Sequence, residues 1–185
     1  MLGLSSWPAG ANCATPDLES VLAAVAIDPP QSVRFREERH NPMLDEPMLL
    51  TGTMEYLERG KMRKRVETPF QESYLVEPGQ VSIERGTEID VIRGRQGKFI
   101  AGFLGGIEAV LAGDMHALEA SFEIRLEGTP QAWTLNLSPR SKRLAKHMQS
   151  LIVKGNTEHV DSIRVQLDEE FHVMKMIHGN GPGVE

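Results

Sequence analysis

The stretch GTMEYLERGKMRKRV, residues 52–66, has the pattern of two strands joined by a turn. Met54 and Tyr56 alternate with polar residues in its first half, and Met62 and Val66 share one face of its second half. One face of the predicted hairpin is therefore apolar and the other is heavily charged. The pattern does not show whether the apolar face packs against a filled core or lines a hollow.

Working outward, the same alternation recurs along most of the chain. Val33 and Phe35 alternate with arginines before the hairpin, and Trp133 and Leu135 share a face later on. Tight-turn residues such as Pro78-Gly79 separate the alternating runs. Short alternating strands joined by such turns predict an antiparallel meander of about ten or eleven strands, rather than a βαβ array.

Helical spacing interrupts the strands at three places. The first helix is expected to start at Thr15-Pro16-Asp17, with Thr15 as its cap, and to end before Pro29-Pro30. The second helical region spans 99–120, with Gly113 as a stop inside it. A short third helix follows Ser138–Ser141. Its apolar positions are Leu144 and Met148.

Composition and charge narrow the function. The chain has 185 residues, of which 40% are hydrophobic and 25% charged, which suits one domain with a substantial core. Its net charge of −6 argues against nucleic acid as a partner, because that binding depends on neutralising phosphates. The basic run Lys61, Arg63, Lys64 and Arg65 is local, and we interpret it as a solvated strand face.

The two ends differ in composition from the middle. Residues 1–14 carry no charged side chain and include Ala9-Gly10-Ala11, a small-x-small pattern typical of signal-peptidase sites. We expect them to be either the remnant of an export signal or a disordered N-terminus. Residues 15–178 should form a single domain and 179–185 a flexible tail. No run of apolar residues is long enough to cross a membrane.

Motifs of enzymes and metal sites are missing from the sequence. None of the six histidines pairs with another ligand at metal-binding spacing, and Cys13, the single cysteine, lies in the suspected leader. There is no GxSxG elbow and no phosphate-binding GxxxxGK[ST]. We therefore expect no catalytic residues, no bound metal and no cofactor.

A large antiparallel sheet with one apolar face must cover that face. It can close on itself, pack on a second sheet, or hold helices against it. A curved sheet that is incompletely filled and covered by helices would leave an apolar cavity. Each methylene buried there contributes about 0.8 kcal/mol, so one acyl chain could be held without covalent chemistry.

The order of these segments resembles the LolA family of periplasmic outer-membrane lipoprotein carriers, and in particular its LolA-related branch. The strands at 33–85 contain the Gly-x-Met-x-Tyr pattern, and 99–128 is similar to the family's central helices and next strand. The W-x-L-x-L-x-P strand opens 133–155, and the closing strands follow at 160–177. The resemblance rests on this ordered set, which spans residues 17–178.

The resemblance implies a mostly antiparallel fold, an unclosed half β-barrel of about eleven strands with a helical lid over an apolar cavity. By position, Arg59 is the candidate for the arginine that latches the lid in known members, although an apparent extra residue also leaves Glu58 as an alternative. The expected lid residues are Ile107, Val110 and Leu111. The expected cavity-lining residues are Val33, Phe35, Leu50, Met54, Tyr56, Met62, Val81, Ile83, Trp133 and Leu135.

The function implied is a periplasmic carrier that shields the acyl chains of lipoproteins, or a related lipid, during transfer toward the outer membrane. Its partners would be an inner-membrane donor and an outer-membrane acceptor. The alternative is an accessory protein or enzyme subunit that handles acyl or aryl-polyene lipids in the cell envelope. Buried carboxylate and histidine at the cavity floor would favour an enzyme, and purely apolar walls would favour a carrier. A solidly filled barrel would instead indicate a structural interaction module.

Overall fold

The computed structural model describes residues 16–78 and 80–178, which form four helices and eleven strands. The helices are α1 Leu18–Val25, α2 Gly94–Leu111, α3 Met115–Ser121 and α4 Lys142–Ala145. The strands are β1 Gln31–His40, β2 Met48–Glu58, β3 Lys61–Thr68, β4 Glu72–Glu77, β5 Gln80–Arg85, β6 Glu88–Val91, β7 Phe122–Thr129, β8 Ala132–Pro139, β9 Ser150–Gly155, β10 Val160–Gln166 and β11 Phe171–Ile177.

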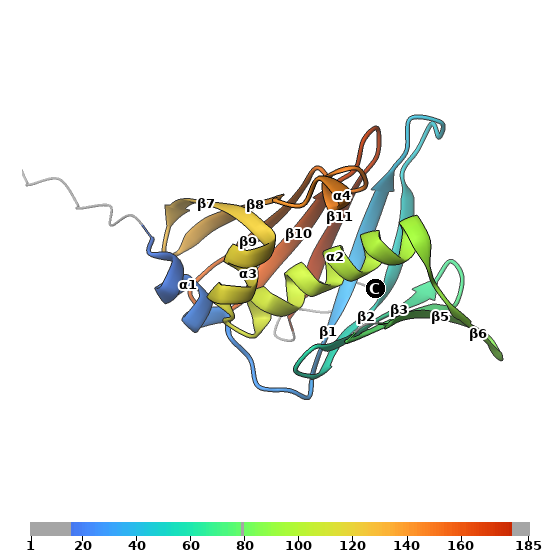
Figure 1. The fold of residues 1–185 in the computed structure, drawn as a ribbon, viewed down its shortest axis with the longest axis horizontal. Coiled ribbons are helices and arrows are strands. Elements are labelled where there is room, and N and C mark those ends of the chain that lie inside the picture. Colours follow the sequence, from blue (N-terminus) through green and yellow to red (C-terminus); the bar gives the residue numbers. More distant parts are fainter. Residues whose placement is uncertain (1–15, 79, 179–185) are drawn as a thin grey trace, which may run out of the picture.

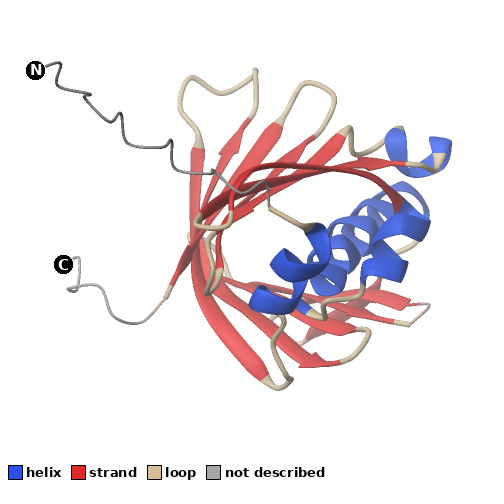
Figure 2. Ribbon diagram, turned by 90° about the vertical axis from the view of Figure 1, so that its left-hand side faces the viewer, coloured by secondary structure: helices blue, strands red, loops and turns tan. Residues whose placement is uncertain are grey.

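All eleven strands belong to one antiparallel sheet, in the order β6-β5-β4-β3-β2-β1-β11-β10-β9-β8-β7 (Figure 1). The first and last strands pair at its centre, where Phe35 lies opposite Met176. The sheet curves strongly around the helices (Figure 2). Within the described residues its ends, β6 and β7, do not pair with each other, so the barrel is unclosed. The predicted strand number and half-barrel fold are confirmed.

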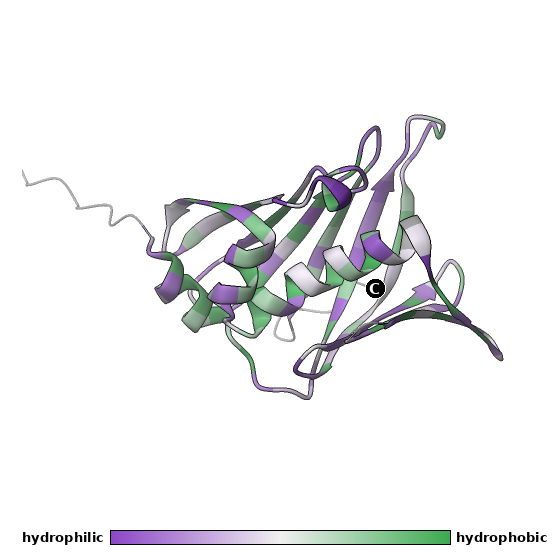
Figure 3. Cartoon of the chain, in the orientation of Figure 1, coloured by the Kyte–Doolittle hydropathy of each residue, from purple (hydrophilic) through white to green (hydrophobic). Residues whose placement is uncertain are grey.

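The β2–β3 hairpin forms as its alternation predicts. Met54 lies opposite Lys64 and Tyr56 opposite Met62, which places these side chains on the inner face. Gly52 is required by close packing, because a Cβ there would lie 1.9 Å from the backbone oxygen of Arg65. Along the strands, hydrophobic and hydrophilic residues alternate (Figure 3).

Helix α2 runs along the concave face of the sheet and contacts β3, β4 and β5 as well as the other three helices (Figure 2). Two of its glycines allow this close approach. A Cβ on Gly102 would lie 2.5 Å from Leu144, and one on Gly106 would lie 2.8 Å from Leu151. The glycine-rich segment of this helix therefore serves packing.

The helix boundaries differ from expectation in three respects. Asp17, rather than Thr15, caps α1, accepting a hydrogen bond from the Ser20 backbone N–H at 3.0 Å. Helix α2 begins at Gly94 instead of residue 99. Helix α4 ends at Ala145, so Met148 lies beyond it, in the core.

Two expectations stay outside the described residues. These are the export-signal remnant or disordered end at 1–14 and the flexible tail at 179–185; Thr15 is also undescribed. Among the described helices, none is both long and apolar enough to span a membrane.

Candidate functional site

A cavity of about 500 Å³ lies between the C-terminal half of α2 and the inner face of the sheet. This volume falls within the range of roughly 300–1,000 Å³ typical of small-molecule sites. Its floor includes the buried Met54, Met62 and Ile163, and Ile107 and Leu111 of α2 cover it. The full lining is Val25, Ile27, Gln31, Ser32, Val33, Arg34, Met54, Tyr56, Met62, Ile107, Leu111, Glu158, His159, Val160, Ile163, Met176, Ile177 and His178.

The structure divides the predicted lining residues into two groups. Val33, Met54, Tyr56 and Met62 line this apolar cavity. The others are buried in the core away from it: Phe35, Leu50, Val81, Ile83, Trp133 and Leu135. Alternation identifies the inner face of a strand, but it does not show which part of that face a helix fills.

Other wall residues come from elements that the sequence reasoning did not select. Val25 and Ile27 approach from α1 and the segment after it, Val160 and Ile163 from β10, and Met176 from β11. Ile163 lies on the inner face of β10, and Val160, three positions earlier, joins it where the register with β9 shifts. Met176 shares the inner face of β11 with the buried Met174. Their place beside β1 depends on the central pairing of the first and last strands.

The predicted lid residues all lie on α2. Ile107 and Leu111 face the apolar cavity, whereas Val110 is buried in the core and does not line it. The helix that covers the cavity is thus held by its neighbours as well as by the cavity walls.

Hydrogen bonds tie this end of α2 to the β2–β3 hairpin through Glu108. Its carboxylate accepts from the Tyr56 hydroxyl at 3.3 Å and from the Gly60 backbone N–H at 3.0 Å. Burial and the adjacent Glu108 carboxylate raise the pKa of Tyr56, which keeps its hydroxyl a donor. Arg59 lies exposed in the same turn, and Glu58 pairs with Lys61 at 3.5 Å. The observed connection therefore has its acceptor on the helix and its donors on the hairpin.

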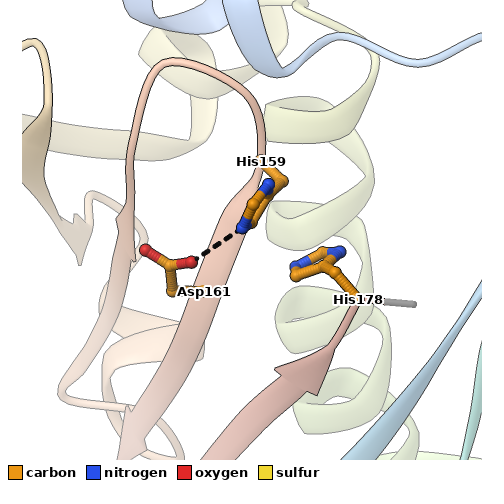
Figure 4. Close-up of side chains that lie close together, drawn as sticks. All are labelled: His159, Asp161 and His178. Carbon is orange, nitrogen blue, oxygen red and sulfur yellow. Dashed lines mark ion pairs between the residues drawn. The ribbon is translucent and has the colours of Figure 1, made fainter. Parts of the chain in front are cut away.

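Two histidines and an aspartate meet at the rim of the apolar cavity (Figure 4). Ligand atoms of His159, Asp161 and His178 lie within 4.8 Å of one another. The Nε2 of His178 lies 2.7 Å from the Val160 carbonyl oxygen, and that of His159 lies 3.1 Å from an Asp161 oxygen. The spacing of these residues in the chain is not metal-like, because the antiparallel pairing of β10 and β11 brings them together.

This donor set suits Zn²⁺ or a similar divalent transition metal. However, Asn156 Nδ2 already donates to Asp161 at 3.1 Å, so the carboxylate has a protein partner without an ion. The cluster is chemically able to hold a metal, but protein partners also satisfy its polar atoms without one.

A second cavity, of about 160 Å³, lies beneath the N-terminal half of α2. Its polar walls include Lys64, Arg39 and His172, and its apolar walls include Phe99 and Phe103. The interpretation of the basic run as a solvated face is therefore wrong for one residue. Lys64 is buried because alternation places it on the inner face between Met62 and Val66.

The buried Glu37 carboxylate organises this second cavity. It pairs with Lys64 Nζ, with Arg39 Nε at 3.0 Å and with His172 Nδ1 at 3.3 Å. Burial alone would raise the pKa of Glu37, but Lys64, His172 and Arg39 together hold it well below its usual range. Burial lowers the pKa of Lys64, and the attraction of Glu37 opposes this shift.

Comparison with solved structures gives distant matches. A LolA superfamily protein from Nitrosomonas europaea is 10% identical, with 87% of this chain and 90% of that chain covered and a TM-score of 0.47. A DUF1329 family protein from Desulfovibrio piger is 9% identical, with 86% and 88% covered and a TM-score of 0.46. The lipoprotein LppX of Mycobacterium tuberculosis is 9% identical, with 90% and 94% covered and a TM-score of 0.39.

The assignment to a family rests on the sequence comparison and not on these distant solved structures. A search of curated proteins found no significant match. By contrast, the sequence profile described as outer membrane lipoprotein carrier protein LolA-like matches residues 9–170, which is most of the chain. With its unclosed eleven-stranded sheet and helix-covered cavity, this chain belongs to the LolA-like family of outer membrane lipoprotein carrier proteins.

Proposed function

We propose that this protein is a periplasmic carrier that shields acyl chains of lipoproteins, or of a related lipid, during transfer toward the outer membrane. The observation that carries the proposal is the apolar cavity of about 500 Å³ beneath α2. Its buried walls are methionine and branched aliphatic side chains together with Tyr56, and Met adapts its shape to irregular apolar ligands. Binding there needs only burial of apolar surface, which is reversible.

A carrier must also load and release its cargo. Helix α2 covers the cavity beside Val25 of α1, and the Glu108 hydrogen bonds to Tyr56 and Gly60 hold α2 to the hairpin. Breaking them leaves the sheet's own hydrogen bonds intact. We therefore propose that cargo enters by displacement of the C-terminal half of α2, with an inner-membrane donor and an outer-membrane acceptor as partners.

The test is uptake of a fluorescent fatty acyl probe by delipidated protein. Met176→Glu places a charge in the cavity wall, and the adjacent Lys175→Glu places the same charge on an exposed position of β11. We expect the wall variant to weaken uptake by about tenfold or more, because burying a carboxylate beside an acyl chain is costly. The exposed variant should bind like the unmodified protein. Equal uptake by both variants would count against the cavity.

The pairing of the buried Glu37 with the partly buried His172 is the specific observation that favours the alternative, an enzyme subunit or accessory protein handling acyl or aryl-polyene lipids. His172 lines the second cavity, however, and neither residue lies at the floor of the apolar one. A general base works best when its pKa lies near the operating pH, whereas Glu37 is held ionised by three donors. Hydrolysis of an acyl ester that disappears in Glu37→Gln would support the enzyme and displace the carrier proposal.

A further inference from the structure

The polar lining of the second cavity carries more positive than negative charge. Lys64 and Arg39 are both cationic, and Glu37 is the carboxylate that pairs with them and with His172. One carboxylate therefore faces an ammonium, a guanidinium and an imidazole. An apolar roof, including Phe103, covers this group.

A nearby acid does not remove this excess. Glu72 lies close enough to influence Lys64, but it forms its own ion pair with Arg85 at 2.5 Å and accepts from the Tyr74 hydroxyl. Arg85 also approaches Asp90 at 3.7 Å. Glu72 and Arg85 thus form their own ion pair between β4 and β5, and the positive charge of Lys64 and Arg39 still exceeds the single negative charge of Glu37.

Both cations retain unused donors. An ammonium has three N–H donors and a guanidinium has five. Throughout the part of the chain that the structure describes, Glu37 is the protein acceptor that Lys64 and Arg39 use. The Lys64 Nζ also lies 5.2 Å from the Phe35 ring centroid and 5.8 Å from that of Phe103. Aromatic faces attract the cation but do not accept its proton as a carboxylate does.

The position of Lys64 is energetically unusual. It occupies an inner-face site of β3 between Met62 and Val66, where an aliphatic side chain would fill space without a desolvation cost. A buried cation with spare donors beside a hollow is suited to receive a negatively charged group.

The volume and position of the second cavity limit which ligands could fit it. About 160 Å³ is small for a lipid and suits a head group. Met62 lines the apolar cavity and Lys64, two positions further along the same face, lines the second, so their Cα atoms lie about 7 Å apart. Both cavities lie under α2, with Phe103 above the second and Ile107 above the first.

We propose that the second cavity is an anion site that takes a carboxylate or phosphate group, with Lys64 and Arg39 as its donors. Where the protein carries lipid, which rests on the function proposed above, that group is the head of an amphiphile whose chain lies in the apolar cavity. The cargo class is then an anionic amphiphile rather than a neutral one. A free small anion offers the same chemistry from another source.

The test compares palmitate with its methyl ester as competitors of a neutral fluorescent acyl probe. Lys64→Met removes the cation, while Glu37 keeps Arg39 and His172 as partners. The matched control is Arg63→Met, on the outer face of the same strand. There Arg63 pairs with Glu55 at 3.2 Å. We expect the unmodified protein and the control to prefer palmitate by about tenfold, as a charged hydrogen bond would give. The preference should fall to about twofold or less in Lys64→Met. If that variant does not fold, Arg39→Met, at a partly exposed position, tests the same preference.

A second arm separates the sources of the anion. Thermal unfolding is measured with inorganic phosphate for the unmodified protein and Lys64→Met. Stabilisation that requires Lys64 supports the anion site even if no lipid binds, in which case the carrier proposal fails alone. Equal binding of palmitate and its ester, with no stabilisation by phosphate, overturns the anion site and leaves the carrier proposal standing.

Discussion

The two cavities beneath α2 share one helix and one sheet face, yet their chemistry is opposite. The larger is walled by Met54, Met62 and Ile163, and the smaller by Lys64 and Arg39. Met62 and Lys64 are alternate residues of the same strand. An inner face is therefore not equivalent to an apolar core, because neighbouring inward residues of one strand line an apolar cavity and a charged one.

The largest expected effect on stability comes from removing the carboxylate that balances the charge of Lys64 beside the second cavity. Glu37→Gln leaves Lys64 buried without its carboxylate, and we expect a loss of about 3–5 kcal/mol in the free energy of unfolding. Chemical denaturation measures it. The double variant Glu37→Gln with Lys64→Met should recover much of that loss, and a double variant as unstable as the single one would show that the pairing is not the cause.

The next effect separates core residues from cavity walls. Leu135→Ala removes a fully buried side chain away from both cavities, and should cost about 2–4 kcal/mol while changing probe affinity less than about twofold. Met176→Ala acts on a partly buried wall, so its stability cost should be smaller and its effect on affinity larger. Denaturation and probe titration of both variants check this. A larger loss of probe affinity in Leu135→Ala than in Met176→Ala would indicate that Leu135 contacts the ligand.

A third prediction concerns acid. The pKa of Glu37 is lowered by folding, so its contribution to stability is fully present above its ordinary pKa of 4.5 and is lost as the pH falls below it. For one proton the slope is at most about 1.4 kcal/mol per pH unit. Unfolding measured across this range should therefore show a shallower acid dependence in Glu37→Gln. An unchanged slope would assign the acid sensitivity to other carboxylates.

The smallest effect concerns the cover of the apolar cavity. Tyr56→Phe removes the hydroxyl that donates to Glu108 but keeps the ring in the wall, and should cost about 1 kcal/mol. Amide exchange in the C-terminal half of α2 should become about fivefold faster. Tyr74→Phe, which loses a hydroxyl bond to Glu72 away from that end of the helix, is the control. Equal exchange rates in both variants would show that the Tyr56 hydroxyl does not hold α2 to the hairpin.

Much of the fold followed from local pattern, and less of the site did. Alternation marked the inner face of β1, β2, β3 and β8, and four of the ten predicted lining residues do line the apolar cavity. The other six, such as Phe35 and Trp133, share that face but lie where other side chains fill the space. The alternation also placed Lys64 inward, although its charge suggested a solvated position.

The sequence by itself determined most of the strands and helices, their antiparallel class and the inward face of strands such as β2, β3 and β8, because these depend on spacing within short segments. Only the tertiary structure decided where the enclosed space stays open, which residues meet there, and that Glu37 neutralises Lys64. Those outcomes depend on pairing β1 with β11 and on laying α2 across the sheet, which join residues far apart in the chain. Packing between residues far apart in the chain depends on the volumes of the side chains that meet, and the periodicity of a short segment does not encode it.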